Sequence, residues 1–253
     1  MKVQAGLVIL LSSLLSTSVH STEVAGQVEP LVVKMAMIRT MNSYYGILAH
    51  SIYQRAFDRL GVKLEMITCE PLECALNVRR GLVDGELARS VYFAEKFPEL
   101  VRVEEPALSI VASAFSTSPM IAVDGFSSLR NSGYRVAYMR GYFLLDNELE
   151  KLKQDVVLVK VAHWKDGLKK LSSGEVDVFV GVEKTVLLEM ARNRHSRIRK
   201  AGEVSRIPVH AYLQKRHDHL ALQLSDMIKQ MKQNGSISRL EKLVDDQFLR
   251  HTQ

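Results

Sequence analysis

Apolar residues recur in two alternating patterns along most of this 253-residue chain. Short apolar runs of strand length are separated by stretches whose apolar residues recur at helical spacing. In residues 45–60, for example, apolar side chains occupy positions 47, 48, 52, 56 and 60, and Gly61 follows as a helix-ending residue. Alternation of strands and helices at these spacings predicts parallel strands joined by crossover helices, an α/β fold.

The same pattern predicts the approximate bounds of the strands and helices. Strands are predicted at 31–38, 62–68, 83–88 and 101–103, at 134–139, 156–161, 176–182 and 207–213, with extended chain at 106–114. Helices are predicted at 45–60, 72–80, 92–97, 143–153, 164–171 and 185–194. Two more apolar helical faces follow at 220–231 and 237–248, separated by the breaker Asn234-Gly235, and we expect both to pack on the core.

A four-residue motif occurs twice. Gly81-Leu82-Val83-Asp84 recurs as Gly174-Glu175-Val176-Asp177, 93 residues later. Each copy follows an amphipathic stretch and runs into an apolar segment that ends at a charged residue, Arg89 or Glu183. This context predicts a helix, a tight glycine turn and a buried strand, built twice. A duplicated α/β half implies two lobes, and small-molecule sites usually form between domains.

The repeat also sets the expected domain boundaries. We expect residues 22–114 and 208–253 to form lobe 1 and residues 115–207 to form lobe 2. Two connections between lobes imply a hinge, and residues 108–119 and 206–213 are the candidates for it.

The first 21 residues have the composition of a secretory signal. Lys2 precedes a short apolar run at 3–15, and Val19 and Ser21 are the small residues expected before a cleavage site. The run is shorter than the roughly 20 apolar residues that span a bilayer about 30 Å thick, which disfavours the alternative of an uncleaved anchor. We therefore expect an exported protein of about 232 residues, starting at Thr22.

Two cysteines, Cys69 and Cys74, lie on either side of Pro71. An oxidising compartment favours a disulfide between them, and two free thiols are the alternative. A structural zinc site needs four ligands, so two lone cysteines do not indicate one.

The formal charge is +6 at pH 7 and becomes +5 when residues 1–21 are removed. Much of the excess lies in residues 192–200, which we interpret as a solvated loop or helix end. The signal sequence and the absence of aromatic residues among these cations disfavour nucleic acid as a partner.

Candidate ligand-binding residues follow from a topological rule. In open α/β sheets, ligands bind beyond the carboxyl ends of the strands. The rule points to Asn42, His163 and Trp164, the last of which we interpret as core, and to the residues that we take as ligand-binding candidates: Arg39, Tyr44, Tyr45, Arg89, Arg140, Gly141, Tyr142 and Glu183.

Each candidate has two interpretations. An arginine at a strand end is suited to clamp a carboxylate, but Arg89 has a structural ion pair with Glu86 or Glu70 as its alternative. Arg140 is a clamp or a solvated side chain, and the backbone N–H groups near Gly141 suit an anion. The tyrosines form an aromatic wall or pack in the core. Glu183 binds a ligand ammonium or caps the following helix.

The layout resembles the periplasmic solute-binding proteins of the family-three type, which serve polar amino-acid uptake. The resemblance rests on the signal, the opening strand at 31–36, the repeated motif, the segment at 134–142 and the segment at 212–216 followed by two helices. It implies a two-lobed, type II periplasmic-binding fold, monomeric, with an inner-membrane transporter permease or a sensor as partner. Lys96 stands where the family carries a clamping arginine, and Val182 where it often carries an aspartate.

No enzyme motif is evident. The chain has no Gly-x-Ser-x-Gly element, phosphate loop or dinucleotide fingerprint, and we expect no cofactor. The sequence favours a protein that closes on a small polar or anionic ligand, an amino acid or related carboxylate. The alternatives are a dehydratase-like or lyase-like enzyme that uses Glu183 or Glu70, and a diverged exported protein that binds nothing.

Overall fold

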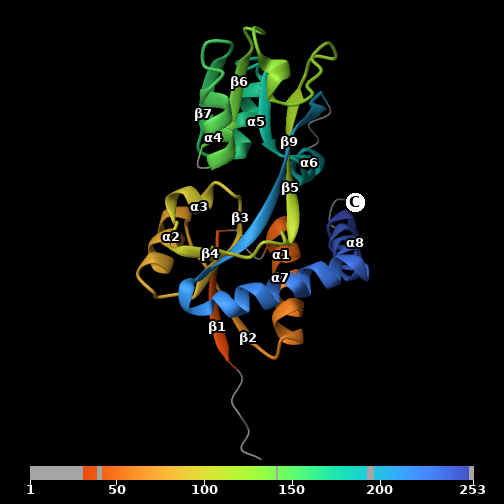
Figure 1. The fold of residues 1–253 in the computed structure, drawn as a ribbon. Coiled ribbons are helices and arrows are strands. Elements are labelled where there is room, and N and C mark those ends of the chain that lie inside the picture. Colours follow the sequence, from red (N-terminus) through yellow and green to blue (C-terminus); the bar gives the residue numbers. More distant parts are fainter. Residues whose placement is uncertain (1–30, 39–41, 141, 193–196, 251–253) are drawn as a thin grey trace, which may run out of the picture.

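Two lobes, one above the other in Figure 1, are joined by a pair of long strands. The computed structural model describes residues 31–38, 42–140, 142–192 and 197–250. The predicted signal at 1–21 lies outside the described residues. No helix within the described ranges combines the length and the apolar character needed to cross a membrane.

Each lobe contains strands and helices in alternation. The lower lobe holds β1 (Val32–Met37), α1 (Tyr44–Arg59), β2 (Lys63–Thr68), α2 (Pro71–Arg79), β3 (Gly85–Arg89), α3 (Phe93–Lys96), β4 (Leu100–Arg102), η2 (Lys215–His217), α7 (Asp218–Gln233) and α8 (Ser236–Arg250). The upper lobe holds η1 (Phe126–Leu129), β6 (Arg135–Met139), α4 (Phe143–Glu150), β7 (Val157–Val161), α5 (Trp164–Ser172), β8 (Val178–Val182) and α6 (Glu183–Arg192). The connecting strands are β5 (Leu108–Ser116) and β9 (Arg199–Gln214).

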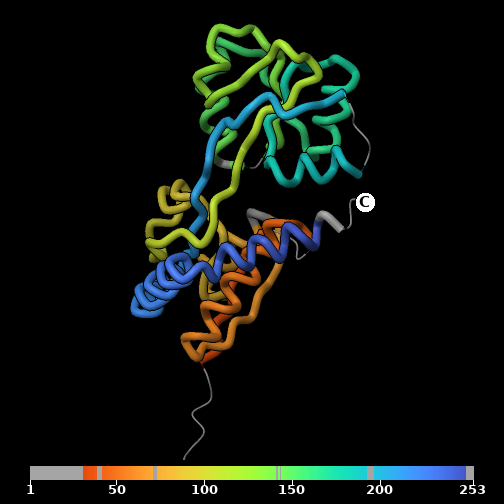
Figure 2. The backbone as a smooth tube through the Cα atoms, turned by 90° about the vertical axis from the view of Figure 1, so that its right-hand side faces the viewer, coloured from red at the N-terminus to blue at the C-terminus, as the bar shows by residue number. Residues whose placement is uncertain are grey.

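The described strands form one continuous sheet in the order β2-β1-β3-β9-β5-β8-β6-β7, and β4 also pairs with β9. The pairs β1–β2, β1–β3, β6–β7 and β6–β8 are parallel, as the alternating pattern predicts. The strand β9 is antiparallel to β3 below and to β5 above, and Figure 2 shows the two connecting strands side by side between the lobes. The connection between the lobes therefore includes both segments that the sequence marks as hinge candidates.

The repeated motif has the same local structure in both lobes. Gly81 and Gly174 have φ angles of 74° and 73°, a left-handed conformation that suits glycine. Each ends a helix, with the next N–H bonded five residues back: Leu82 to the carbonyl of Asn77, and Glu175 to that of Lys170.

The aspartate that closes each copy fixes the neighbouring strand. The N–H of Lys34 donates to Asp84 Oδ2 at 2.8 Å, and the N–H of Asp84 donates to the Lys34 carbonyl at 2.7 Å. In the other lobe, Asp177 and Arg135 make the same reciprocal pair at 2.9 Å and 2.9 Å. These shared contacts explain why the same residue types recur. The role of the motif is to fix the register between neighbouring strands.

Each lobe has its own core. In the lower lobe, apolar side chains of β1, α1, α7 and α8 form one large buried cluster. In the upper lobe, two clusters cover opposite faces of the sheet, one under α4 and one under α5. Both tail helices pack on the lower lobe, as their apolar faces predict.

Most predicted elements agree with the structure to within two residues, but β9 was only partly predicted. It begins at Arg199, not at 207, so Arg199 and Lys200 belong to a strand and not to a solvated loop. Arg199 donates to the carbonyls of Ser118 and Ile121, both at 2.7 Å. The basic composition of this segment concealed a strand whose arginine has backbone partners.

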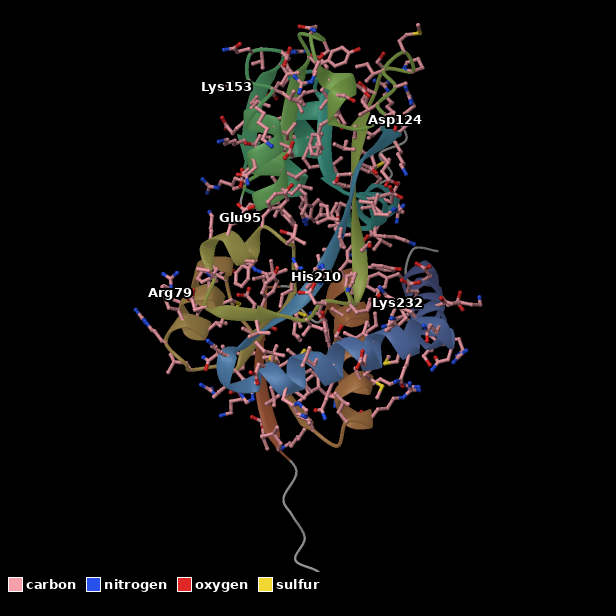
Figure 3. The ribbon with its side chains drawn as sticks, viewed as in Figure 1. Arg79, Glu95, Asp124, Lys153, His210 and Lys232 are labelled. Carbon is pink, nitrogen blue, oxygen red and sulfur yellow. A yellow bond between two sulfur atoms is a disulfide. The ribbon has the colours of Figure 1, made fainter. Side chains whose placement is uncertain are left out.

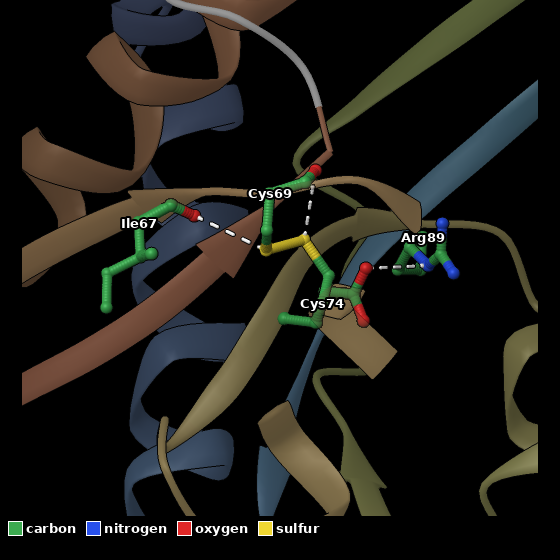
Figure 4. The surroundings of a disulfide bond; sticks show 5 residues. Ile67, Cys69, Cys74 and Arg89 are labelled. Carbon is green, nitrogen blue, oxygen red and sulfur yellow. Dashed lines mark hydrogen bonds and ion pairs between the residues drawn. A yellow bond between two sulfur atoms is a disulfide. The ribbon is translucent and has the colours of Figure 1, made fainter. Parts of the chain in front are cut away.

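Cys69 and Cys74 form a disulfide with a Cα–Cα distance of 5.4 Å (Figure 4). The bond spans the corner between β2 and α2, where Pro71 is the first residue of the helix. It ties the entry of α2 to the edge strand.

Candidate functional site

A cavity lies between the lobes, against the two connecting strands. We call it the inter-lobe cavity; its volume is about 70 Å³, and it opens to solvent. Its lining comes from the ends of β1, β3 and β8, the starts of α3 and α4, and the middle of β5 and β9. The lining residues are Ile38, Ala88, Arg89, Ser90, Phe93, Ile110, Ala112, Tyr142, Leu144, Leu145, Val182, Ile207 and Val209.

A bulge in β3 brings Arg89 to this cavity. Glu86 is in register with Tyr212 and Arg89 with His210, so three steps along β3 correspond to two along β9. The extra residue coincides with Ala88, whose φ of 58° lies in the left-handed region. In a regular strand, residues three apart point to opposite faces. The bulge reverses this relation and places Glu86 and Arg89 on the same side.

The Arg89 guanidinium has two defined neighbours. Its Nε lies 3.0 Å from Oε1 of Glu86, in an ion pair marked by the dashed line at Arg89 in Figure 4. Its Cζ lies 4.5 Å from the ring centroid of Phe93, at the first turn of α3. A cation–π contact of this kind helps to orient an arginine. Arg89 is only 6% exposed, so its position is well constrained.

Glu86 is fully buried beneath Arg89. Burial raises the pKa of this carboxyl to about 7, because desolvation outweighs the opposing effect of the Arg89 charge. The Glu86 carboxyl therefore takes up or releases its proton near neutral pH, and the net charge of the Glu86–Arg89 pair changes with it.

The strand β9 supports this arrangement from the other side. Tyr212 is buried, packs edge-on against Phe93, and donates its hydroxyl to the carbonyl of Ser90 at 3.1 Å. His210, labelled in Figure 3 where β9 passes between the lobes, has Nδ1 2.8 Å from the carbonyl of Val103. Burial lowers the pKa of His210, and because a carbonyl oxygen only accepts, the ring donates from Nδ1 in this contact.

The upper lobe contributes the opposite wall. Tyr142 caps the start of α4 and lines the cavity together with Leu144 and Leu145. Tyr142 also borders a smaller cavity that includes Trp164. The tyrosine is the one predicted aromatic residue that the structure places at the inter-lobe cavity.

Tyr44 and Tyr45 lie elsewhere. The helix α1 begins at Tyr44, which turns both rings into the lower lobe, where they pack edge to face with centroids 5.0 Å apart. Tyr45 receives the N–H of Val111 at 3.5 Å. Tyr44 contacts Lys184 of α6, whose Nζ lies 5.0 Å from the Tyr44 ring and 2.5 Å from Asp245 of α8. This second contact between the lobes is separate from the cavity.

The remaining candidates are dispersed. Glu183 is the first residue of α6, accepts the Ser113 hydroxyl at 2.5 Å and pairs with Lys200 at 2.6 Å, and these partners lower the pKa of its carboxyl. It is not among the residues that line the cavity. Arg140 is exposed. Arg39 and Gly141 lie outside the described residues.

The alternative catalytic acids also lie away from the cavity. Glu70 is exposed at the start of α2, and Glu183 is held by the partners described above. Lys96, at the position of the family's clamping arginine, is exposed at the end of α3. Within the described part of the chain, no cluster of histidine, cysteine or acidic residues is arranged to hold a metal ion.

Sequence reasoning missed most of the apolar lining. Ile110, Ile207 and Val209 lie in the connecting strands, and Leu144 and Leu145 in the first turn of α4. A search restricted to charged and aromatic residues at strand ends overlooks such positions. These positions could have been found, because the expected hinge segments and the start of the helix at 143 must border the space between the lobes.

Comparisons with known proteins agree with this architecture. No family model matches the chain. An uncharacterized protein of Shewanella oneidensis is 26% identical over 214 residues, which is 84% of this chain and 81% of that protein.

Several solved structures resemble this chain in fold although their sequence identity to it is low. An ancestral arginine-binding protein bound to arginine superposes with a TM-score of 0.64 at 16% identity, over 83% of this chain and 96% of that one. The chain has the fold of the family-three periplasmic binding proteins. An arginine transport system periplasmic binding protein from Legionella pneumophila gives a TM-score of 0.63 at 13% identity, over 85% and 99% of the two chains.

This periplasmic-binding fold is also used by receptors. A histidine kinase sensor domain superposes with a TM-score of 0.65 at 16% identity, over 84% of this chain and 95% of that domain. At these identities the comparison defines the two-lobed fold, and the neighbours described here are binding proteins or sensor domains, not enzymes.

Proposed function

We propose that this protein is an exported, periplasmic solute-binding protein. Its lobes close on a small ligand that carries a carboxylate, an amino acid or a related compound, and the closed form is delivered to an inner-membrane transporter permease or a sensor. The observation that carries the proposal is the position of Arg89: a buried guanidinium lines the cavity between two lobes that are connected by strands.

The geometry fits closure around a ligand. A carboxylate is bound well by a planar guanidinium that is already oriented, and the contact with Phe93 orients Arg89. Residues from both lobes line the cavity, so a ligand in it contacts both. Two-lobed proteins with hinge segments respond to such a ligand by domain closure. The solved structures with this fold include proteins named for arginine binding, which supports a solute-binding role here.

The test is a thermal-shift screen of amino acids, dicarboxylates, small peptides and simple carboxylic acids. A ligand present at 100 times its Kd adds about 2.7 kcal/mol of stability. We expect a raised Tm with at least one carboxylate, and a smaller radius of gyration by X-ray scattering. The absence of any shift with wild-type protein across the panel would contradict the proposal.

Export is tested separately. Expression with the complete N-terminus and cell fractionation should yield a periplasmic protein whose N-terminal residue is Thr22. A protein that keeps residues 1–21 would favour the anchored alternative.

A further inference from the structure

We infer that the inter-lobe cavity selects a carboxylate with an apolar body and no ammonium group. The inference rests on the proposed function, and it narrows the ligand class from amino acids to simple organic acids such as branched-chain or aromatic monocarboxylates. Three features of the cavity carry it: its charge composition, the engagement of the nearby acids, and the origin of its apolar walls.

The first feature is the charge composition. Of the thirteen described lining residues, ten are apolar, and the other three are Arg89, Ser90 and Tyr142. The described lining thus has a cation and no carboxylate. The undescribed residues next to lining positions in the sequence, 39–41 and 141, are Arg, Thr, Met and Gly, so none of them adds an acidic group.

The second feature is that the acids next to lining residues, which are Glu86, Asp146 and Glu183, all have partners. Glu86 is 0% exposed and lies 3.0 Å from Arg89, so it faces the guanidinium and not the cavity. Glu183 follows the lining residue Val182, but its carboxylate pairs with Lys200 and accepts the Ser113 hydroxyl. A ligand ammonium in the cavity would therefore replace its hydration by contacts with aliphatic groups, and burying an uncompensated charge in this way is strongly unfavourable.

The third feature is the origin of the apolar walls. Ile110, Ile207 and Val209 come from the connecting strands, while Leu144 and Leu145 come from α4 of the upper lobe. Domain closure brings these two walls together, and an apolar ligand body between them gains from burial on both sides. Closure is thereby driven by the ligand body, and Arg89 sets its orientation.

Glu86 adjusts the strength of this anchor. A ligand carboxylate at Arg89 competes with a carboxylate already 3.0 Å away, and two negative charges share one guanidinium. Glu86→Gln removes that competition with little change in volume. Because the pKa of Glu86 is about 7, only about one tenth of the wild-type protein has this carboxyl protonated at pH 8, so Glu86→Gln should tighten binding of an anionic ligand by up to about tenfold at pH 8 and have little effect below pH 6.

The experiment compares each amino acid with its analogue that lacks the amino group. Calorimetry with the purified protein measures 4-methylpentanoate against leucine, and 3-phenylpropanoate against phenylalanine. We expect at least one monocarboxylate to bind, and its amino acid partner to bind about 100-fold more weakly or not at all, as expected for an uncompensated buried charge.

Variants identify the anchor. Arg89→Met alone leaves Glu86 buried without its cation, so the double variant Glu86→Gln/Arg89→Met is measured as well. The matched control is Lys170→Met/Glu175→Gln, which removes an ion pair of 2.6 Å between α5 and the turn that follows it, and neither residue lines the cavity. Binding should be lost in the first double variant and kept in the control.

The outcomes separate the two proposals. An amino acid that binds as tightly as its analogue, or more tightly, would overturn the inference and leave solute binding intact. Retained binding in a folded Glu86→Gln/Arg89→Met protein would overturn Arg89 as the anchor. Failure of every carboxylate and amino acid in the wider panel would remove the proposed function itself.

Discussion

Because Glu86 is buried, we expect the free energy of unfolding to be larger at mildly acidic pH than at neutral pH. The pKa of Glu86 is raised by burial from the ordinary 4.5 to about 7 in the folded protein. Between these values the unfolded chain has released the proton while the folded chain retains it, so the free energy of unfolding falls as pH rises. At 1.36 kcal/mol per pKa unit, the contribution lost between pH 4.5 and pH 7 is about 3 kcal/mol.

The assay is urea unfolding at half-unit steps from pH 4.5 to pH 8, for wild type and Glu86→Gln. Subtracting the two curves cancels the groups that titrate in both proteins. We expect Glu86→Gln to gain about 3 kcal/mol on wild type across the window and no more above it. A difference that stays constant with pH would refute the raised pKa. A wild type that gains on the variant with rising pH would mean that Arg89 stabilises the carboxylate more than burial penalises it.

Three further predictions concern stability. The pKa of Asp177 is lowered mainly by its side-chain hydrogen bond with Arg135, so the ionised carboxylate stabilises the fold above its ordinary pKa of 3.8. In urea titrations, the stability advantage of wild type over Asp177→Asn should therefore shrink as pH falls below that value. Ala88→Gly relieves a φ of 58° and should leave the unfolding free energy unchanged or raise it by up to about 1 kcal/mol, whereas Ala88→Val should lower it; equal losses in chemical denaturation would refute a left-handed Ala88. Replacing Cys69 and Cys74 by serine should lower the unfolding free energy by about 2 kcal/mol, the value for so short a loop, with no effect of reductant on the variant.

The fold was largely predictable because local patterns carry it. From the sequence alone, periodicity located both tail helices and the parallel strands, and the repeated motif indicated two lobes. In each lobe the motif has a local explanation, a left-handed glycine followed by an aspartate that bonds to the neighbouring strand. What periodicity missed is the first half of β9, where charged residues at irregular spacing (199, 200, 203 and 206) leave only a weak apolar signal.

The site was less predictable because it depends on pairing between distant segments. The rule on strand ends selected Arg89 and Tyr142, and both line the cavity. It also selected Tyr44 and Tyr45, because the sequence does not reveal that α1 begins one residue earlier and turns both rings inward. The sequence left open whether Arg89 pairs with Glu86 or binds a ligand. The structure shows the pair and, in the same residue, the cavity wall.

The two interpretations of Arg89 are compatible once the bulge is considered. Without the extra residue at Ala88, Glu86 and Arg89 would point to opposite faces, and the arginine would have no buried counter-charge. With it, Arg89 remains in a nearly buried position in the absence of ligand, because the neighbouring carboxylate balances its charge when ionised. A bound carboxylate would take over that role as Glu86 becomes protonated. The strained residue at the end of β3 is therefore the feature that converts a structural ion pair into a wall of the cavity.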